Sequence, residues 1–295
     1  MNPDMLTLTP GNISLSQLRG IVAQFQTIHL HETCIAGIHA SAEAVRRIVA
    51  AGKPAYGINT GFGKLAKVHI PVEQLEQLQT NLVRSHAVGV GVLLDDACVR
   101  LIMALKIASL ARGHSGVRMD TLETLVAMYN AQVWPCIPSQ GSVGASGDLA
   151  PLAHLALAAM GEGSVRVAGQ VLPAAEGLQR AGIVPLRLAA KEGLALLNGT
   201  QVSTGIALVA MFGAEQVFSA AVLAGALSVD AACGSDAPFD PRIHAVRGQP
   251  GQIEVAAAYR QLLAGSAIRE SHRLDDTRVQ DPYSLRCQPQ VMGAC

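Results

Sequence analysis

The stretch GSVGASGDLAPLAH, residues 141–154, places three glycines and two serines directly before an apolar helix start. A tract of this composition is ordinarily a flexible loop, and Asp148 would then cap the helix that follows. A second interpretation is an anion site at the helix N-terminus. The pattern for such a site is weak, because no lysine of the G-x-x-x-x-G-K-[ST] motif follows and Pro151 comes soon after the glycines.

A third interpretation is a chemical change of the backbone at Ala145-Ser146-Gly147. Because Gly147 has no Cβ, its amide nitrogen can approach the carbonyl carbon of Ala145 and close a five-membered ring. Loss of water from that ring and of the Ser146 hydroxyl leaves an exocyclic methylidene, which is a strong electrophile. It would lie at the N-terminal end of the helix after Asp148, where the helix dipole favours developing negative charge.

The composition predicts a folded, mostly helical protein with a small ligand. The chain has 295 residues, of which 50% are apolar and only 3% aromatic, which favours closely packed helices over an aromatic-rich β-sandwich. Lysine and arginine together number 22, as do aspartate and glutamate, and no long run of one sign occurs. We therefore expect neither a nucleic-acid nor an anionic-membrane partner.

Cysteine and histidine spacing gives no indication of a metal site. The six cysteines form no C-x-x-C pair and the nine histidines no H-E-x-x-H motif, so neither zinc nor a disulfide framework is expected. The first 17 residues, MNPDMLTLTPGNISLSQ, lack the basic start and continuous apolar core of a signal peptide. These features predict a reduced, cytoplasmic setting.

The spacing of apolar residues predicts a mainly α chain. MLTLTPGNIS, residues 5–14, suggests a short strand and turn, and a later helix ends at Gly52. From Pro71 onward helical periodicity dominates. Three helices are predicted there. The first begins at Pro71, the second runs from Asp95 to Arg112, and the third runs from about Met119 to Asn130.

Two further elements follow the glycine-rich stretch. SVRVAGQVLPA, residues 164–174, alternates and turns at Ala168-Gly169, which predicts a small hairpin standing off the helices. Two apolar stretches, 202–214 and 217–229, are divided by two polar residues, and neither reaches the length that a bilayer needs. Together they predict one long buried helix.

These elements suggest two parts. The first, residues 1–112, is small and mixed α/β and carries the glycine-rich loop around Tyr56. The second, residues 113–295, is the first part of a long-helix bundle and carries the Ala-Ser-Gly triplet.

GSVGASGDLAPLAH resembles the signature of the aromatic amino acid ammonia-lyases, in which Ala-Ser-Gly becomes the prosthetic group 4-methylidene-imidazol-5-one (MIO). Three further segments resemble the family in the same order and spacing. They are YGINTGFG (56–63), LLNGTQ (196–201) and RVQDPYSLRCQPQVMG (278–293). The resemblance implies the helical fold of the ammonia-lyases, which is similar to that of fumarase and aspartase. It also implies a homotetramer with shared active sites and no external cofactor.

The resemblance assigns roles around the triplet. Ala145 and Gly147 would be cross-linked and Ser146 would be the modified residue. Asp148 matches the aspartate that assists the cyclisation, although helix capping explains it equally well. Tyr56 matches the family's catalytic tyrosine, and a phenol needs nearby positive charge or helix dipoles to act as a base near neutral pH.

Four more residues match substrate-binding positions. Asn198 matches the residue that holds the substrate and the prosthetic group, and Arg286 the arginine that pairs bidentately with the substrate carboxylate. Gln280 and Tyr283 are three residues apart, as are Tyr283 and Arg286, so a helical turn would place all three on one side. Without the resemblance, this trio would be interpreted as solvated surface.

The expected substrate follows from Ser85-His86. Relatives acting on phenylalanine carry Phe-Leu there, those acting on tyrosine carry His-Leu, and Ser-His is the histidine type. Because one imidazole can hydrogen-bond another, His86 suits a histidine substrate. The resemblance thus implies conversion of L-histidine to trans-urocanate and ammonia, the first step of histidine catabolism, with phenylalanine or tyrosine lyases and aminomutases as alternatives.

One departure concerns length. Family members are considerably longer and continue through a second half of long helices, which carries further active-site residues and covers much of the predicted long helix. This chain stops at Cys295. A second hypothesis is therefore a catalytically incompetent, truncated piece, and we expect little ammonia-lyase activity from these 295 residues alone.

Overall fold

A computed structural model describes residues 5–63, 67–274 and 276–295. The chain divides into two compact units, an N-terminal unit that ends at Val209 and a C-terminal unit from Ala210 to Cys295. Helices predominate in both units, so the predicted mainly α class is confirmed. The expected division by role near Arg112 stays a prediction.

The N-terminal unit contains eight α-helices and seven short strands within the described residues. The helices are α1 Leu15–Ala23, α2 Ile35–Ala51, α3 Leu75–His86, α4 Asp96–Leu110, α5 Met119–Asn130, α6 Leu149–Ala159, α7 Ala174–Arg180 and α8 Glu192–Leu197. The strands are β1 Met5–Leu8, β2 Thr27–Leu30, β3 Val90–Leu93, β4 Trp134–Pro135, β5 Pro138–Gln140, β6 Ser164–Val167 and β7 Gln170–Pro173.

Local sequence explains several of these boundaries. The carboxylate of Asp95 accepts a hydrogen bond from the Cys98 amide at 2.7 Å and thereby starts α4. Gly52, with φ of 65°, ends α2 in the left-handed conformation that glycine adopts without strain. The predicted helix 119–130 matches α5.

The predicted hairpin is present, and its turn is the expected one. Ala168 and Gly169 both have positive φ, 48° and 79°, as a tight two-residue turn requires. The hairpin does not stand off the helices, however. Strand β6 also pairs with β4, and α7 packs so closely that a Cβ on Gly177 would lie 2.3 Å from the Val165 side chain. That prediction was wrong because alternation alone does not reveal what covers a strand.

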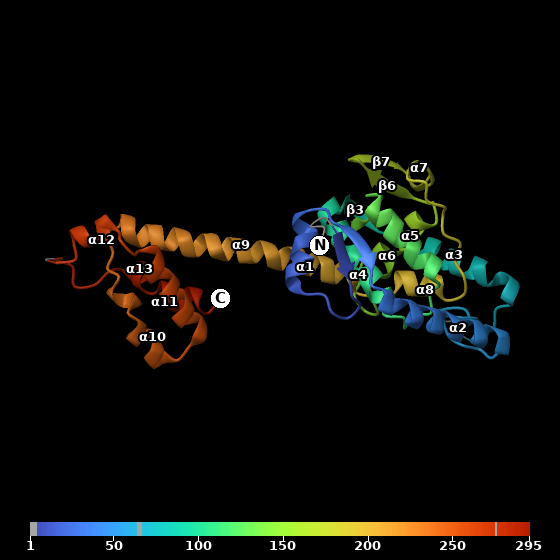
Figure 1. Cartoon of the computed structure of the whole chain (residues 1–295), viewed down its shortest axis with the longest axis horizontal. Helices are drawn as coiled ribbons and strands as arrows, with labels where there is room; N and C mark the ends of the chain where they lie inside the picture. Colours follow the sequence, from blue (N-terminus) through green and yellow to red (C-terminus); the bar gives the residue numbers. More distant parts are fainter. Residues whose placement is uncertain (1–4, 64–66, 275) are drawn as a thin grey trace. The chain divides into compact units, whose positions relative to one another are not determined.

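The core of the N-terminal unit forms around α4 and α6, which are apolar on nearly every side. Helix α4 buries Leu101, Ile102 and Ile107 completely, and α6 buries Leu152 and Leu155. Helices α3 and α8 pack against α6 and against each other (Figure 1). The three helices therefore hold the ends of several loops in fixed positions.

The predicted long helix is a single element, α9, Gln201–Ala231, and the boundary between the two units falls inside it. Residues near both ends of α9 are buried, among them Val202 and Val229, but Val217 is 71% exposed and Leu227 is 70% exposed. The described residues leave much of the apolar surface of α9 uncovered, as expected for a chain without the second half of long helices. Length and composition alone would let α9 cross a membrane, but core helices of soluble proteins share these properties.

The C-terminal unit begins within α9 and continues through short helices. They are α10 Pro241–Arg247, α11 Pro250–Leu262, α12 Ala267–Ser271, α13 Tyr283–Arg286 and α14 Gln288–Met292. A small core joins the end of α9 to α11. It consists of Ala226, Val229, Phe239, Val255, Tyr259 and Leu263.

Candidate active site

The Ala-Ser-Gly triplet lies between β5 and α6, at the N-terminal end of α6. Ala145 and Ser146 are exposed, whereas Gly147 and Asp148 are buried. The chain thus enters the protein interior in the middle of the triplet, with the Ser146 side chain outside and the Gly147 amide inside.

Gly147 occupies a position that no other residue fits. Its φ is 124°, and a Cβ there would lie 2.7 Å from the Asn198 side-chain oxygen and 2.8 Å from the Gly199 amide nitrogen. Both distances are shorter than real Cβ contacts, so glycine is required by the backbone angle and by the space. The structure therefore places Asn198 and Gly199 directly against the triplet.

Asp148 does not cap α6, as the simplest interpretation of the sequence suggested. One carboxylate oxygen accepts a hydrogen bond from the Ser142 hydroxyl at 2.6 Å. The other accepts from the amide and the hydroxyl of Ser203, at 2.7 and 2.9 Å. Because Ser203 is the third residue of α9, this buried carboxylate satisfies a free amide at the N-terminus of α9, where the helix dipole favours negative charge. Sequence reasoning missed Ser203, which is far away along the chain.

Asn198 follows the last residue of α8. Its amide donates to the Leu194 carbonyl at 3.0 Å, and the next carbonyl, that of Gly199, accepts the Asp148 amide at 2.7 Å. This bond and the Gly147 contact join the two segments, so the expected proximity of Asn198 to the triplet agrees with the structure.

His86 is the last residue of α3. Its Nδ1 lies 2.8 Å from the Leu82 carbonyl and 3.1 Å from the Ser85 hydroxyl. The strand that follows, β3, pairs with β5, with Val90 opposite Gln140. Since β5 leads into the glycine-rich stretch, the segments that carry His86 and the triplet run side by side.

His154, the last residue of the glycine-rich motif, fixes the turn after His86. Its Nε2 accepts the Gly89 amide at 3.1 Å. Burial lowers the pKa of His154, which keeps the ring neutral and able to accept this hydrogen bond.

Tyr56 lies on a turn that packs against α8. A Cβ on Gly57, whose φ is 77°, would lie 2.4 Å from the Leu194 side chain. Inside the turn, the buried Asn59 accepts the Ala55 amide at 2.7 Å and donates to a backbone carbonyl. Tyr56 itself is 60% exposed, with its ring edge against Phe62. The sequence analysis did not single out Asn59, although it belongs to the same motif as Tyr56.

Gln280, Tyr283 and Arg286 belong to the C-terminal unit. Arg286 donates to the side-chain oxygen of Gln280, and Tyr283 is 70% exposed. The expectation of one helical turn for all three was wrong. Helix α13 starts only at Tyr283, because Pro282 disfavours helical conformation in the residue before it.

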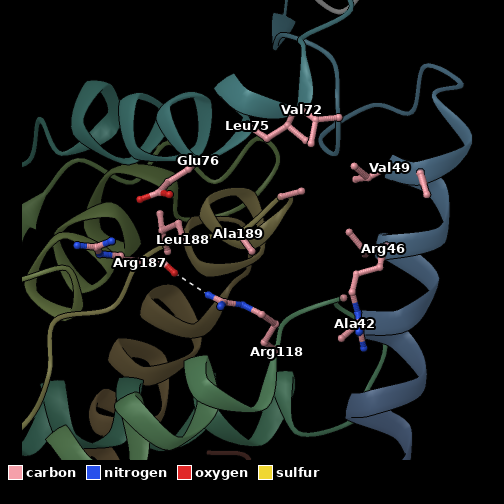
Figure 2. Close-up of a pocket in the computed structure, with 14 residues that line it drawn as sticks. Ala42, Arg46, Val49, Val72, Leu75, Glu76, Arg118, Arg187, Leu188 and Ala189 are labelled. Atoms are coloured by element: carbon pink, nitrogen blue, oxygen red, sulfur yellow. Dashed lines mark hydrogen bonds between the residues drawn. The ribbon is translucent and has the colours of Figure 1, made fainter.

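The cavity shown in Figure 2 is separate from these residues. Its volume is about 730 Å³, and α2, the start of α3 and residues 187–190 form much of its wall. Arg118 at its edge donates to the Arg187 carbonyl at 2.6 Å and pairs with the buried Glu192 at 2.8 Å. No residue assigned a role from the sequence lines this cavity. Among the described residues no cluster of histidine, cysteine or acidic side chains suits a metal ion.

A family model described as aromatic amino acid lyase matches residues 13–295. The chain belongs to this family. Among curated relatives, the histidine ammonia-lyase of Aromatoleum aromaticum is 61% identical over 288 residues, and that of Burkholderia vietnamiensis is 59% identical over 291 residues. These matches cover 98% and 99% of this chain but 55% and 57% of the relatives. The chain thus spans about half the length of the curated relatives it matches.

Solved structures agree with the family assignment and with the ammonia-lyase fold. The histidine ammonia-lyase of Trypanosoma cruzi has a TM-score of 0.88 and 36% identity, over 98% of this chain and 54% of that one. The phenylalanine aminomutase of Pantoea agglomerans has a TM-score of 0.89 and 32% identity, over 98% and 59%. The resemblance inferred from the motifs is confirmed.

Proposed function

We propose that the whole protein is a histidine ammonia-lyase, which converts L-histidine to trans-urocanate and ammonia with MIO formed from its own backbone. The observation that carries the proposal is the environment of Gly147 and Asp148. The glycine lies where no Cβ fits, and the buried aspartate accepts three hydrogen bonds beside it. The names of the curated relatives support the choice of substrate.

The residues present fit the formation of MIO. In that reaction the Gly147 nitrogen bonds to the Ala145 carbonyl carbon, and the Ala145 oxygen leaves as water with the two amide hydrogens of Gly147 and Ser146. The Ser146 hydroxyl leaves as a second water with the Ser146 α-hydrogen, so no oxidant is required. The left-handed backbone of Gly147 and the bond between the Asp148 amide and the Gly199 carbonyl favour the bent conformation that ring closure needs.

When present, MIO supplies an electrophile that makes the substrate amino group a leaving group. The residues of this chain supply the remaining functions. The Tyr56 phenol takes the β-proton, Asn198 holds the substrate beside the triplet, and the Arg286 guanidinium pairs with the carboxylate. Gln280 and Tyr283 accompany Arg286 on the same segment.

We also propose a homotetramer in which Tyr283 and Arg286 serve the triplet of a neighbouring subunit. Tyr283 is exposed, and Arg286 donates a hydrogen bond to Gln280 of its own segment. Both side chains are therefore accessible to a neighbouring subunit. A cytoplasmic location remains part of the same proposal.

His86 supports a substrate with an imidazole ring. Its Nδ1 lies at hydrogen-bond distance from the Leu82 carbonyl, which can only accept, so this nitrogen carries the proton in that bond. In a neutral ring Nε2 is then an acceptor, and it can receive the N–H of a substrate imidazole. A phenylalanine ring offers no such donor.

Substrate competition tests the proposal. The purified protein is incubated with L-histidine, L-phenylalanine or L-tyrosine, and urocanate is followed by its ultraviolet absorbance. We expect turnover of histidine to exceed the others, and His86→Leu to reduce it through loss of a hydrogen bond of about 1–3 kcal/mol. A preference for phenylalanine, or β-amino acids as products, would favour the alternatives within the family.

The same assay addresses the second hypothesis. Residues 1–295 are compared with a chain extended by the C-terminal portion of the Aromatoleum aromaticum relative. Because the apolar side chains of α9 are exposed, we expect the shorter chain to aggregate and to make little urocanate. Comparable turnover by a stable short form would overturn this expectation.

A further inference from the structure

Lys106 carries a buried amino group that none of the assigned roles explains. It lies in the C-terminal half of α4 and is only 2% exposed. Burial lowers its pKa to about 7. An ammonium group removed from water is costly unless its hydrogens are bonded, so the contacts of Lys106 indicate what it does.

Both acceptors lie at the C-terminal end of α8. The Nζ atom donates to the Ala195 carbonyl at 2.7 Å and to the Asn198 carbonyl at 3.3 Å. Carbonyl groups in the last turn of a helix lack partners within it, and the helix dipole there favours positive charge. Lys106 therefore fixes the direction in which the chain leaves α8.

The segment that Lys106 holds is the one that contacts the triplet. The Asn198 side-chain oxygen and the Gly199 amide are the atoms nearest the missing Cβ of Gly147, and the Gly199 carbonyl accepts the Asp148 amide. One side of this segment thus meets the lysine, and the other meets the residues that would form MIO.

We propose that Lys106 is a positioning residue that holds Asn198 and Gly199 against Gly147 and Asp148, and so sets the rate at which Ala145-Ser146-Gly147 closes its ring. This rests on the proposed function. Lys106 touches neither the substrate nor the reacting atoms and acts only through the backbone. A displacement of this segment would slow cyclisation, because such reactions depend on close approach of the reacting atoms.

A matched control is available at the other end of α8. Lys191 immediately precedes that helix, is half-buried, and also donates to a backbone carbonyl, that of Ser115, at 3.1 Å. Its pKa is lowered by burial as well. Lys191→Met therefore removes a comparable amino group from the opposite end of α8, away from the segment beside the triplet.

The experiment compares the unaltered protein with Lys106→Met, Lys106→Arg and Lys191→Met. Circular dichroism gives the melting temperature, and mass spectrometry of the peptide spanning residues 141–154 gives the fraction that has lost two waters at intervals after synthesis. We expect Lys106→Met to stay folded and to close the ring on the order of tenfold more slowly or worse. Lys106→Arg should recover part of the rate, and Lys191→Met should match the unaltered protein.

A purely structural lysine would change the melting temperature but not the rate of ring closure in the folded protein. Ring closure at the normal rate in folded Lys106→Met, or equal slowing by Lys191→Met, would overturn the inference. If Lys106→Met is insoluble, Lys106→Gln is measured instead, because the glutamine side chain is too short to reach both carbonyls. A normal rate of ring closure in that variant would also overturn the inference. Absence of the modification in the unaltered protein would instead refute the proposed function.

Discussion

The motif residues at the end of the triplet are buried in the N-terminal unit, whereas those assigned roles in the C-terminal unit are largely exposed. In the N-terminal unit, Asp148 is fully buried and accepts three hydrogen bonds, and Gly147 lies against Asn198. In the C-terminal unit, Tyr283 is 70% exposed, and Arg286 donates to Gln280 on the surface. The difference indicates that contacts within the N-terminal unit fix the backbone around the triplet. The side chains proposed to bind the substrate carboxylate have few contacts within the C-terminal unit.

This comparison separates two kinds of substitution. Changes near the triplet should affect modification of the backbone and the stability of the N-terminal unit. Changes in the segment 280–286 should affect substrate binding and leave both of these properties intact.

Ser146→Ala should have the largest effect. It removes the hydroxyl that leaves during formation of MIO, so we expect neither modification nor measurable urocanate. Because Ser146 is exposed, the melting temperature should not change. Ser142→Ala is the control: it removes one of three hydrogen bonds to Asp148 and should cost about 1 kcal/mol of stability with activity largely retained. Substantial turnover by Ser146→Ala would contradict the assignment.

Asp148→Asn should destabilise the N-terminal unit by about 1–3 kcal/mol, because the NH2 of asparagine would replace one accepting oxygen and face the donor of Ser142 or those of Ser203. Urea denaturation measures the loss. Asp276→Asn is the control in the C-terminal unit, where the carboxylate pairs with Arg278 at the surface, and it should change little. Equal losses in the two variants would remove the contrast between the units.

Arg286→Lys should raise KM for L-histidine by about tenfold, because a lysine cannot form the planar, bidentate pair with a carboxylate. Modification of the triplet and the melting temperature should remain as in the unaltered protein. Steady-state kinetics and mass spectrometry test this together. Loss of the modification in Arg286→Lys would mean that ring closure in the N-terminal unit depends on a side chain of the C-terminal unit.

The smallest effect concerns pH and His154. Its pKa is lowered in the folded protein, so as pH falls below the ordinary value of about 6.5 the unfolded chain takes up a proton first. The free energy of unfolding should therefore decrease as pH falls from 7 towards 5, by less than about 1.4 kcal/mol per pH unit for this group. His154→Gln should flatten that dependence, and an unchanged slope would contradict a lowered pKa of His154 in the folded protein.

Local patterns predicted what local forces determine. The start of α4 at Asp95, the bounds of α5 and the turn at Ala168-Gly169 follow from caps, periodicity and backbone preference. The triplet was recognised because it is contiguous in the sequence.

What could not be predicted depends on distant partners. Capping of its own helix was one of two interpretations of Asp148, but the carboxylate bonds Ser203, which comes much later in the chain. Nothing in the sequence around Lys106 indicates that its amino group will bond two carbonyl groups at the C-terminal end of α8. The apolar content of α9 predicted the helix itself, but composition does not specify which residues cover it.

The most direct test of the account is the mass of the peptide that spans residues 141–154, released from purified, catalytically active protein. The account predicts a peptide lighter than its sequence by two waters, with the change confined to Ala145-Ser146-Gly147. It also predicts that the same peptide from Ser146→Ala lacks this modification and that the variant makes no urocanate. An unmodified peptide from protein that makes urocanate would contradict the central claim.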